Sequence, residues 1–511
     1  MNTDQQTYNH HTINYLQQIA HTLHKHQAYL VGGSVRNLLL GKPCVDWDVA
    51  TDGDAVQIAK QVANKLGGIF VHMHDKANRI IVKGEGQEWI CDLSPLQGET
   101  IEADLHTRDF TINALAIPLA DVLDYLTQGG QLTPIDPLNG MNDLASRRLR
   151  MVHDRVFQID PLRMLRAVRF MQQYQLTLED QTEQAIIRDA PLLPAVAAER
   201  IHEELYTILQ PQGARDVLRF LDSHRLLTTL IPELQPARGM PQPSLHHWDV
   251  FGHSLETVAT LEELARVLQL DATEIARMPM ETTSERHLAE IQQLLFEAEQ
   301  QKLFQFAALH TPTVKLGALL HDIGKTVTYA VDADGNITFY HHPEAGIPLA
   351  QQIMQRIHAS TQDRRLVQQI VAHHMRPGQL SHHTVTPRAI RRYFVDLGPS
   401  GIIVTLVSLA DHLAMRGPKA LTAHWWRHLA TVRLLLHSYI RERERIMPPR
   451  LLQTNELIQH FELQPGPIIG QLLESIAEAQ ADGIIRSKED ALWFAEEQLA
   501  AIAQAKVEQF P

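Results

Sequence analysis

This 511-residue chain is poor in the features that mark several protein classes. Its only cysteines are Cys44 and Cys91, which excludes a disulfide scaffold or a cysteine metal site and is compatible with a reducing compartment. No segment approaches the roughly 20 apolar residues of a membrane helix. The first 27 residues are polar and rich in histidine, without the apolar run of a signal peptide. These absences predict a soluble, cytoplasmic protein that does not contact membranes.

Positive charge is also scarce, because 46 Lys and Arg face 59 Asp and Glu, for a net charge of −13. That average argues against nucleic-acid binding, but affinity depends on local phosphate contacts. Residues 388–450 hold 11 Lys plus Arg against 4 Asp plus Glu, with aromatic residues interleaved. Within this region, Arg441 to Arg445 is best interpreted as a solvated helix face with compensating charges. The wider basic region is a candidate for gripping a nucleic-acid backbone.

The segment from Tyr29 to Asp48 is the most informative. An apolar strand leads into Gly32-Gly33 and a helix start, where backbone N–H groups and the positive helix end can hold a phosphate. The alternation at residues 45–50 then places Asp46 and Asp48 on one face of a strand. Because two like charges there require a cation between them, this arrangement predicts Mg²⁺-assisted attack on a nucleotide phosphate.

Further motifs follow in order, and with them the sequence resembles the class II tRNA nucleotidyltransferases and the related bacterial poly(A) polymerases. These motifs lie at residues 105–115, 136–144, 160–170 and 199–204, and the first contains Arg-Asp-Phe-Thr-Ile-Asn-Ala. The resemblance implies a multidomain α+β protein. Its mixed α/β catalytic head, like the palm of DNA polymerase beta, spans residues 28–152, and a helical neck spans 153–240.

The resemblance also implies residue roles in the head. Asp46 and Asp48 bind Mg²⁺, and Asp92 is the best candidate for a third catalytic carboxylate. Gly33 and Arg36 hold the triphosphate. The residues expected to bind the nucleotide are Gly32, Gly33, Arg36, Arg108, Asp109, Asn113, Asp160, Arg163, Arg166 and Arg169.

Base selection is expected from the motif that begins at Asp160. A carboxylate and a guanidinium three residues apart share one helical face, so Asp160 and Arg163 offer an acceptor and forked donors. Such a pair complements the exocyclic amine and the neighbouring ring acceptor of cytosine or adenine. Three positions depart from the family's usual pattern: Asn37 replaces Asp, Ile159 replaces Glu, and Gln97 replaces Arg. Asn37 carries no charge to orient Arg36.

Histidine is abundant, with 29 residues, and one ordered series resembles the HD phosphohydrolase superfamily. The series is His253, His321, Asp322, His342, His373, His374 and Asp411. The resemblance implies that His253, His321, Asp322 and Asp411 form the core site and that His342, His373 and His374 complete a second metal position. Such ligands with open positions suit Mn²⁺, Ni²⁺, Fe²⁺ or Mg²⁺. A bound metal would generate a hydroxide that hydrolyses phosphoesters. By analogy with related two-domain enzymes, the expected substrates are cyclic or terminal phosphates at RNA 3′ ends.

At 511 residues the chain is too long for one core, which predicts three or four domains. Strands are expected at 29–31, 46–50, 69–72, 79–82, 89–93 and 112–117, with a helix at 54–66 that ends at Gly67-Gly68. From Asp160 onward the periodicity is helical. A polar lead-in spans 1–27, a hinge 232–243, the HD domain 241–420 with a possible insertion at 281–302, and a helical tRNA-binding arm 421–511.

Together these features predict a template-independent enzyme that adds or repairs the tRNA 3′-terminal CCA from CTP and ATP, with an accessory HD phosphohydrolase. Enzymes that add only CC, only A or a poly(A) tail share all the head motifs and remain alternatives. In a second alternative the HD domain supplies the main activity and the head binds RNA. In a third, the chain is a non-enzymatic RNA-binding module. The sequence does not predict the oligomeric state.

Overall fold

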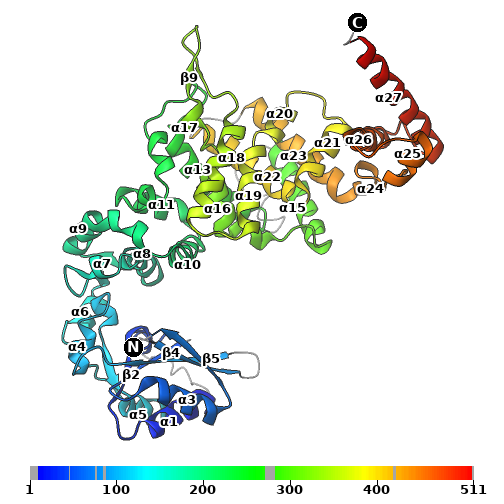
Figure 1. Ribbon diagram of the computed structural model, residues 1–511. Coiled ribbons are helices and arrows are strands. Elements are labelled where there is room, and N and C mark those ends of the chain that lie inside the picture. Colours follow the sequence, from blue (N-terminus) through cyan, green and yellow to red (C-terminus); the bar gives the residue numbers. More distant parts are fainter. Residues whose placement is uncertain are drawn as a thin grey trace. The chain divides into compact units, whose positions relative to one another are not determined.

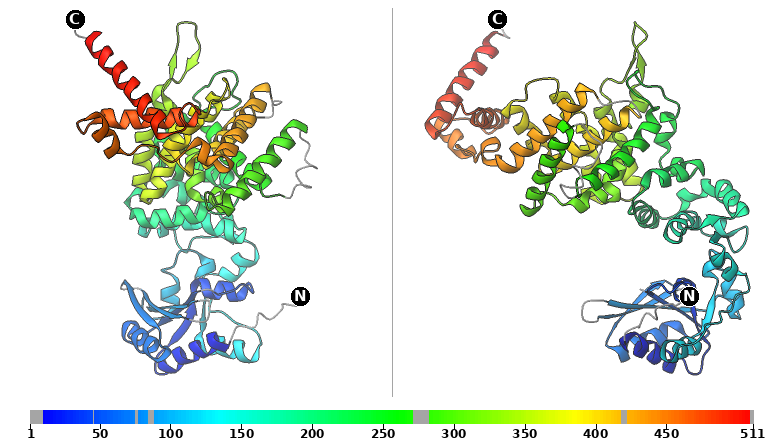
Figure 2. Two further views of the ribbon diagram at one scale, coloured as in Figure 1. Left: turned by 90° about the vertical axis from the view of Figure 1, so that its right-hand side faces the viewer. Right: turned by 180° about the vertical axis from the view of Figure 1, so that it is seen from behind.

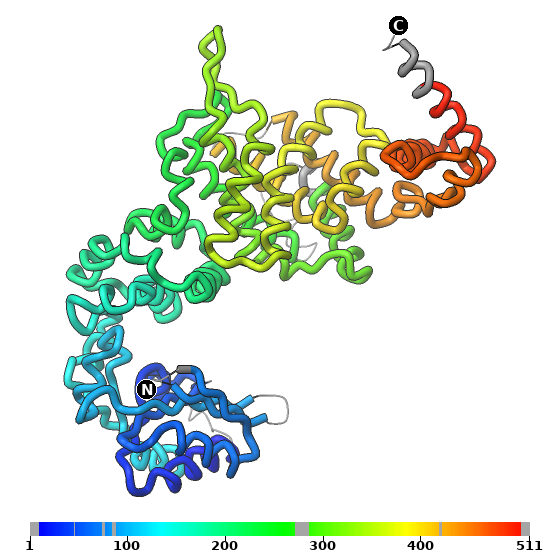
Figure 3. Tube along the Cα trace, in the orientation of Figure 1, coloured from blue at the N-terminus to red at the C-terminus, as the bar shows by residue number. Residues whose placement is uncertain are grey.

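The computed structural model describes residues 10–44, 46–74, 77–83, 88–270, 282–417 and 422–508. The chain forms two compact units. The first comprises Met1–Glu204 and His224–Thr229, and the second comprises Leu205–Ser223 and Leu230–Pro511. Figure 3 traces the chain through both.

The first unit contains the strands of the main sheet and a series of short helices (Figure 1). The strands are β1 (Ala28–Val31), β2 (Asp46–Thr51), β3 (Ile69–His74), β4 (Ala77–Lys83), β5 (Glu88–Pro95), β6 (Ala116–Pro118), β7 (Arg148–Leu149) and β8 (Thr177–Leu178). The helices are α1 (His10–Thr22), α2 (Gly32–Leu39), α3 (Ala55–Leu66), α4 (Ile101–Leu105), η1 (Thr111–Asn113), α5 (Leu119–Gln128), α6 (Gly140–Ala145), α7 (Val156–Ile159), α8 (Arg163–Tyr174), α9 (Asp180–Asp189), η2 (Ala190–Ala195), α10 (Ala198–Leu209), whose last residues belong to the second unit, and α12 (Leu226–Leu230).

The main sheet has six strands in the order β3-β4-β5-β2-β1-β6. Only the pair β2 and β5 is parallel, and the other neighbours are antiparallel. Helices α1, α3 and α5 lie along one face of the sheet (Figure 1), where buried Trp47, Val49 and Ile80 belong to the hydrophobic core. The opposite face of β2 is thereby left for polar side chains.

Five of the six predicted strands are confirmed, each with slightly longer bounds than expected. The helix predicted at 54–66 is also confirmed. Asp54 caps it by accepting a hydrogen bond from the Gln57 N–H, and Gly67 ends it at a φ of 63°, in the left-handed region that glycine tolerates.

The sixth predicted strand, at 112–117, is wrong in its first half. Thr111 to Asn113 form a 3₁₀ turn, and the strand starts only at Ala116. Thr111 explains the difference, because its hydroxyl donates to the buried Asp143 carboxylate at 2.7 Å and its N–H donates to the Arg150 carbonyl at 3.0 Å. These bonds take Thr111 out of the sheet and turn Asn113 toward the catalytic face.

The second unit is helical except for one short hairpin, among the residues described. Its elements are α11 (Ala214–Ser223), η3 (Pro232–Ala237), α13 (Val250–Val267), α15 (Thr282–Gln300), η4 (Phe306–His310), α16 (Pro312–Leu320), α17 (Lys325–Thr328), β9 (Ala330–Val331), β10 (Ile337–Thr338), α18 (His342–Arg356), α19 (Thr361–His373), α20 (Arg376–Leu380), α21 (Pro387–Leu397), α22 (Ser400–Met415), α23 (Ala423–Arg441), α24 (Arg443–Ile446), α25 (Thr454–Phe461), α26 (Pro467–Ala481) and α27 (Lys488–Glu508). The hairpin of β9 and β10 projects from these helices (Figure 2).

Helices α13, α16, α18, α19 and α22 pack against one another in this unit. Helix α15, which covers the described part of the predicted insertion, packs on α23 through the ion pairs Glu290–Arg433 and Glu297–Arg441; Glu281 lies outside the described residues. No single described helix is long and apolar enough to cross a membrane, although the pair α21 and α22, bent by 106°, meets the length and composition test when taken together.

Lys315 fixes the position of helix α16, which ends at the His-Asp motif. Its ammonium group is fully buried, contacts the Glu262 carboxylate at 2.8 Å, and donates to the carbonyls of Leu209 and Pro211, both at 2.7 Å. A buried charge is tolerated only with partners of this kind.

We expect Lys315→Ala to destabilise the second unit by about 3 to 5 kcal/mol, because it leaves the buried Glu262 carboxylate without its counter-charge. Denaturant unfolding followed by circular dichroism measures the change. Lys488→Ala is the matched control: its pair with Glu456 is exposed, so the loss should stay below about 1 kcal/mol. Equal effects of the two substitutions would contradict this account of Lys315.

Candidate active sites

Two carboxylates project from β2 beside the parallel strand β5. Asp46 and Asp48 alternate with the buried Trp47, as the period of two predicted. The strand register places Asp48 directly opposite Asp92. Burial and the Asp92 carboxylate raise the pKa of Asp48 to about 6, and burial raises the pKa of Asp46. Because like charges so close together repel, the cluster favours a divalent cation.

Asp92 differs from the other two carboxylates in having an arginine partner. Arg79 of the neighbouring strand β4 donates from Nε and Nη2 to the two Asp92 oxygens, both at 2.8 Å. The structure therefore brings Asp92 to the pair predicted from the sequence, with its charge already balanced by Arg79. Sequence analysis missed Arg79, since it lies 13 positions before Asp92 and outside every recognised motif.

The phosphate-binding side of the site begins at the start of helix α2. Gly32 has a φ of 66°, and a Cβ atom there would lie 2.8 Å from Nη1 of Arg108. Glycine is thus required both by the backbone and by the close approach of this guanidinium. Arg108 is held in place by Asp104, which accepts from its Nε at 3.0 Å and its Nη2 at 2.8 Å.

Asp109 links the head to helix α8. It is buried and accepts from Nη2 of Arg166 at 2.7 Å and from the Asn113 amide at 2.9 Å. Burial alone would raise the pKa of Asp109, but the Arg166 charge and these hydrogen bonds lower it to about 2. Arg169, one turn further along α8, is paired with Glu204 at 2.8 Å. Asp109 and Glu204 therefore orient α8 and its arginines.

The expectation that Asp160 and Arg163 share a helical face is wrong. Asp160 lies before α8 in extended backbone, with a φ of −143°, because Pro161 disfavours a helical conformation in the residue before it. Asp160 is paired with Arg200 at 2.8 Å, whereas Arg163 donates to the carbonyls of Thr107 and Arg108. The two side chains are thus fixed separately, yet both line the same cleft.

That cleft has a volume of about 570 Å³ and lies within the first unit. All thirteen residues predicted from the sequence to be catalytic or to bind the nucleotide line it, together with Val31, Ala77, Ser94, Phe170 and Arg200. It combines a carboxylate cluster at one wall with several guanidinium groups, which is the chemistry needed to hold a metal-bound triphosphate. The departures at Gln97 and Ile159 lie outside its lining, and Ile159 is 65% exposed.

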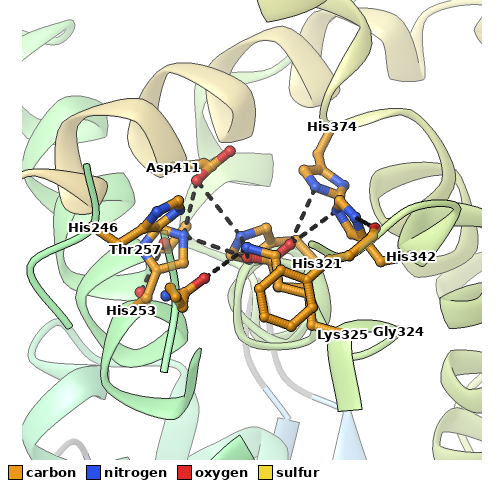
Figure 4. Close-up of polar contacts among 12 residues, drawn as sticks. His246, His253, Thr257, His321, Gly324, Lys325, His342, His374 and Asp411 are labelled. Carbon is orange, nitrogen blue, oxygen red and sulfur yellow. Dashed lines mark hydrogen bonds and ion pairs between the residues drawn. The ribbon is translucent and has the colours of Figure 1, made fainter. Parts of the chain in front are cut away.

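The second site lies among the central helices of the second unit (Figure 4). Side chains from α13, α18 and α22 and from the ends of α16 and α19 converge there. The side chains form two groups, and within each group the possible ligand atoms all lie within 4.8 Å of one another. The first group is His253, His321 and Asp411. The second is His321, Asp322 and His374. His342 joins through Asp322 at 3.2 Å. Lys325 lies 2.6 Å from the same carboxylate.

The hydrogen bonds of this site fit a metal. His321, His342 and His374 each present Nδ1 to a backbone carbonyl, at 2.8 to 2.9 Å. Such a bond fixes the tautomer with the proton on Nδ1 and leaves Nε2 as a lone-pair donor. In all three residues Nε2 is buried, makes no hydrogen bond, and faces an Asp322 oxygen at 3.2 to 3.5 Å, so that lone pairs of nitrogen and oxygen point at one another. Three bare nitrogens beside two carboxylates are a donor set suited to a divalent transition metal.

One predicted ligand does not join this arrangement. His373 belongs to neither group of ligand atoms found among the described residues, and its Nδ1 faces Nη1 of Arg376 at 3.5 Å. His246, which sequence analysis missed, lies beside His253 with ring centroids 5.7 Å apart. Burial and the nearby Lys325 charge lower the pKa of His246 to about 4, so it is neutral at pH 7. The pair His246-His247 shortly before His253 was the available sequence signal.

The basic region at 388–450 is largely paired with carboxylates. Arg391 pairs with Glu474, and Arg388 and Arg392 both pair with Glu478. Arg433 and Arg441 are held by α15, as described above, and Arg445 pairs with Glu442. These arginines fasten helices together, so the local charge excess overstates what the region offers to a nucleic acid.

Comparison with protein families identifies three matching segments. The Poly A polymerase head domain matches residues 28–150. The family described as the probable RNA and SrmB-binding site of polymerase A matches residues 175–238, and the HD domain matches residues 250–416. The first and third segments contain the cleft carboxylates and the histidine cluster, respectively.

Relatives of comparable length match nearly the whole chain. This chain is 31% identical to the A-adding tRNA nucleotidyltransferase of Deinococcus radiodurans, over 91% of this chain and 94% of the relative. This chain is also 29% identical to the CC-adding tRNA nucleotidyltransferase of Synechocystis sp., over 92% of this chain and 93% of that relative. The solved structure of the Thermotoga maritima CCA-adding enzyme complexed with tRNA has the same fold, with a TM-score of 0.55 and 20% identity over 97% of each chain.

Proposed function

We propose a reaction for this chain on the premise that it belongs to the tRNA nucleotidyltransferase family. It adds C, C and A to the 3′ end of tRNA, from CTP and ATP, without a nucleic-acid template. The observation that carries the proposal is the single cleft in which three carboxylates face the guanidinium groups of the head and of α8. With tRNA as substrate, we also propose that the enzyme acts in the cytoplasm.

Each wall of the cleft has its own task in this reaction. Asp46 and Asp48 would hold Mg²⁺, which, when bound, supplies charge neutralisation at the α-phosphate and activates the attacking oxygen. Gly32, Arg36 and Arg108 bind the triphosphate by backbone N–H and guanidinium groups. The tRNA 3′-hydroxyl forms the new bond to the α-phosphorus, and the bond to pyrophosphate breaks. Positioning and charge provide most of the rate enhancement.

Selection of C and A would depend on Asp160 and Arg163. Arg200 and the carbonyls of Thr107 and Arg108 hold these two groups independently, so the cleft presents an acceptor and a donor in fixed places. Cytosine and adenine each combine an exocyclic amine with a neighbouring ring acceptor, which matches this pair. Guanine and uracil present a carbonyl acceptor beside a ring N–H donor, which is the opposite pattern, so the cleft should not bind them productively.

The test follows product length on three tRNA transcripts that end before CCA, after CC and after CCA. With Mg²⁺ and both nucleotides, we expect the first two to be extended to CCA and the third to remain unchanged. CTP alone should give CC on the first transcript, and ATP alone should give A on the second. Growth by CC alone, by A alone or by an unbounded A tail would contradict full CCA addition and identify a sibling activity.

We propose a second activity for the histidine cluster: metal-dependent hydrolysis of phosphoesters at RNA 3′ ends. The three Nε2 atoms support it, because their lone pairs, together with the Asp322 and Asp411 carboxylates, can hold the divalent metal that such hydrolysis needs. His253, His321, Asp322, His342, His374 and Asp411 would hold Mn²⁺, Ni²⁺, Fe²⁺ or Mg²⁺. Cyclic and terminal phosphates are the expected substrates, since their removal frees the 3′ end for extension.

The division into a lead-in at 1–27, head at 28–152, neck at 153–240, HD domain at 241–420 and arm at 421–511 stays a prediction. So does tRNA binding by the arm.

A further inference from the structure

Arg36 is a buried cation without a carboxylate partner among the described residues. It is only 5% exposed, yet it lines the nucleotide cleft. Its hydrogen-bond acceptors are all neutral: the Asn113 side-chain oxygen, the Tyr174 hydroxyl at 2.6 Å and the Asn37 side-chain oxygen at 3.3 Å. Its Nε is buried with no partner. A buried guanidinium held only by neutral groups keeps its full charge for a ligand.

Tyr174 is the central element of this arrangement. It is 8% exposed and ends helix α8, the helix that begins with Arg163. Its hydroxyl accepts from Arg36 and donates to Asn37 at 3.0 Å, so one oxygen bridges both residues. The Arg36 guanidinium carbon also lies 4.2 Å from the centroid of the Tyr174 ring. The phenol therefore restrains the guanidinium through both a hydrogen bond and a ring contact.

A second set of contacts holds the other edge of the same guanidinium. Nη1 of Arg36 donates to Asn113, whose amide donates to Asp109 at 2.9 Å. Asp109 in turn accepts from Arg166 of α8. Helix α8 thus reaches Arg36 directly through Tyr174 and through the Phe170 ring, whose centroid lies 5.2 Å from the guanidinium carbon, and indirectly through Asp109. Among these, Tyr174 is the one that accepts a hydrogen bond from Arg36. The Asp109 charge is already balanced by Arg166 and does not contact Arg36.

We propose that Tyr174 is the positioning residue for the triphosphate-binding Arg36 and replaces a carboxylate in that role. Because Asn37 is neutral, the Tyr174 hydroxyl supplies the acceptor that fixes the guanidinium without neutralising it. The inference rests on the proposed function only in assuming that the triphosphate occupies this cleft. It predicts that loss of the hydroxyl weakens the binding of phosphate, whichever base the nucleotide carries.

The test is Tyr174→Phe, which keeps the ring and removes the acceptor. We expect the KM values for CTP and ATP to rise by the same factor, about tenfold to thirtyfold, because a hydrogen bond to a charged group is lost. The kcat should change less than about threefold, as expected when an interaction common to ground and transition states is removed. The inhibition constant of inorganic pyrophosphate, which has no base, should rise by the same factor as KM.

Restoring a carboxylate should rescue the variant. Asn37→Asp in the Tyr174→Phe background places a charged acceptor next to Arg36, and we expect KM to return to within about threefold of wild type. Tyr29→Phe is the matched control, since within the described part of the chain its hydroxyl bonds to the exposed Gln27 side chain alone, at 3.1 Å. Thermal unfolding of each variant shows whether the head is folded.

Three results would overturn the inference: an unchanged KM in Tyr174→Phe, unequal changes for CTP and ATP, or no rescue by Asn37→Asp in a folded double variant. Failure of the proposed function looks different, because the wild-type protein would then add neither nucleotide. In that case calorimetric binding of inorganic pyrophosphate to wild type and Tyr174→Phe still decides the inference, since weaker binding by the variant supports it and equal binding contradicts it.

Discussion

Asp48→Asn should reduce nucleotide addition by about a thousandfold or more, which corresponds to about 4 kcal/mol of lost transition-state stabilisation. Asp48 is more enclosed than Asp46 and lies directly opposite Asp92 in the strand register. The amide keeps the shape of the side chain but removes the charge that a divalent cation requires. Single-nucleotide extension of a tRNA transcript that lacks CCA measures the effect.

The same substitution should not lower stability. Replacing a buried carboxylate opposite Asp92 with a neutral amide removes like-charge repulsion, so metal-free Asp48→Asn should unfold at a temperature no lower than wild type. Asp121→Asn, on the exposed side of helix α5, is the matched control and should keep full activity. Addition by Asp48→Asn within tenfold of wild type would show that this carboxylate does not bind the catalytic metal.

Asp322→Ala should abolish metal binding in the second unit, with bound transition metal falling about a hundredfold or more in apparent affinity. The Asp322 carboxylate lies within 3.5 Å of His321, His342 and His374. Its removal separates the two groups of ligands and leaves the Lys325 ammonium, now 2.6 Å from Asp322, without its partner. Elemental analysis after dialysis and hydrolysis of a cyclic nucleotide phosphate measure the two consequences.

Loss of Asp322 leaves the buried Lys325 charge without its carboxylate partner, which could by itself destabilise the unit. Asp411→Asn is therefore a second variant, which keeps the Lys325–Asp322 pair and should also lose the metal. His373→Ala is the sharper control: it neighbours His374 in sequence but faces Arg376, so it should retain both metal and hydrolysis. Loss of metal in His373→Ala would instead show that His373 is a ligand, as the sequence predicted. Nucleotide addition by the head should be unchanged in all three variants, since the head carboxylates belong to the other unit.

Patterns that are local along the chain were predicted well. The alternation around Trp47 placed Asp46 and Asp48 on one face, and Asp54 with Gly67 bounded helix α3. Both features depend on contacts within a few residues, namely the pleat of a strand and the caps of a helix. The motif at Asp160 shows the limit, since its spacing suited a helix until the restriction imposed by Pro161 moved Asp160 out of it.

The sequence by itself determined the family to which the chain belongs and the motif residues that line the cleft, because motif residues and their order can be read without coordinates. Only the tertiary structure decided which residues meet. It placed Arg79 on Asp92 and Tyr174 on Arg36, 13 and 138 positions apart. It turned His374, not His373, toward Asp322, since successive residues on a helix point about 100° apart. It also paired the basic region with distant glutamates. These outcomes depend on how helices and strands pack, and packing is a property of the whole chain.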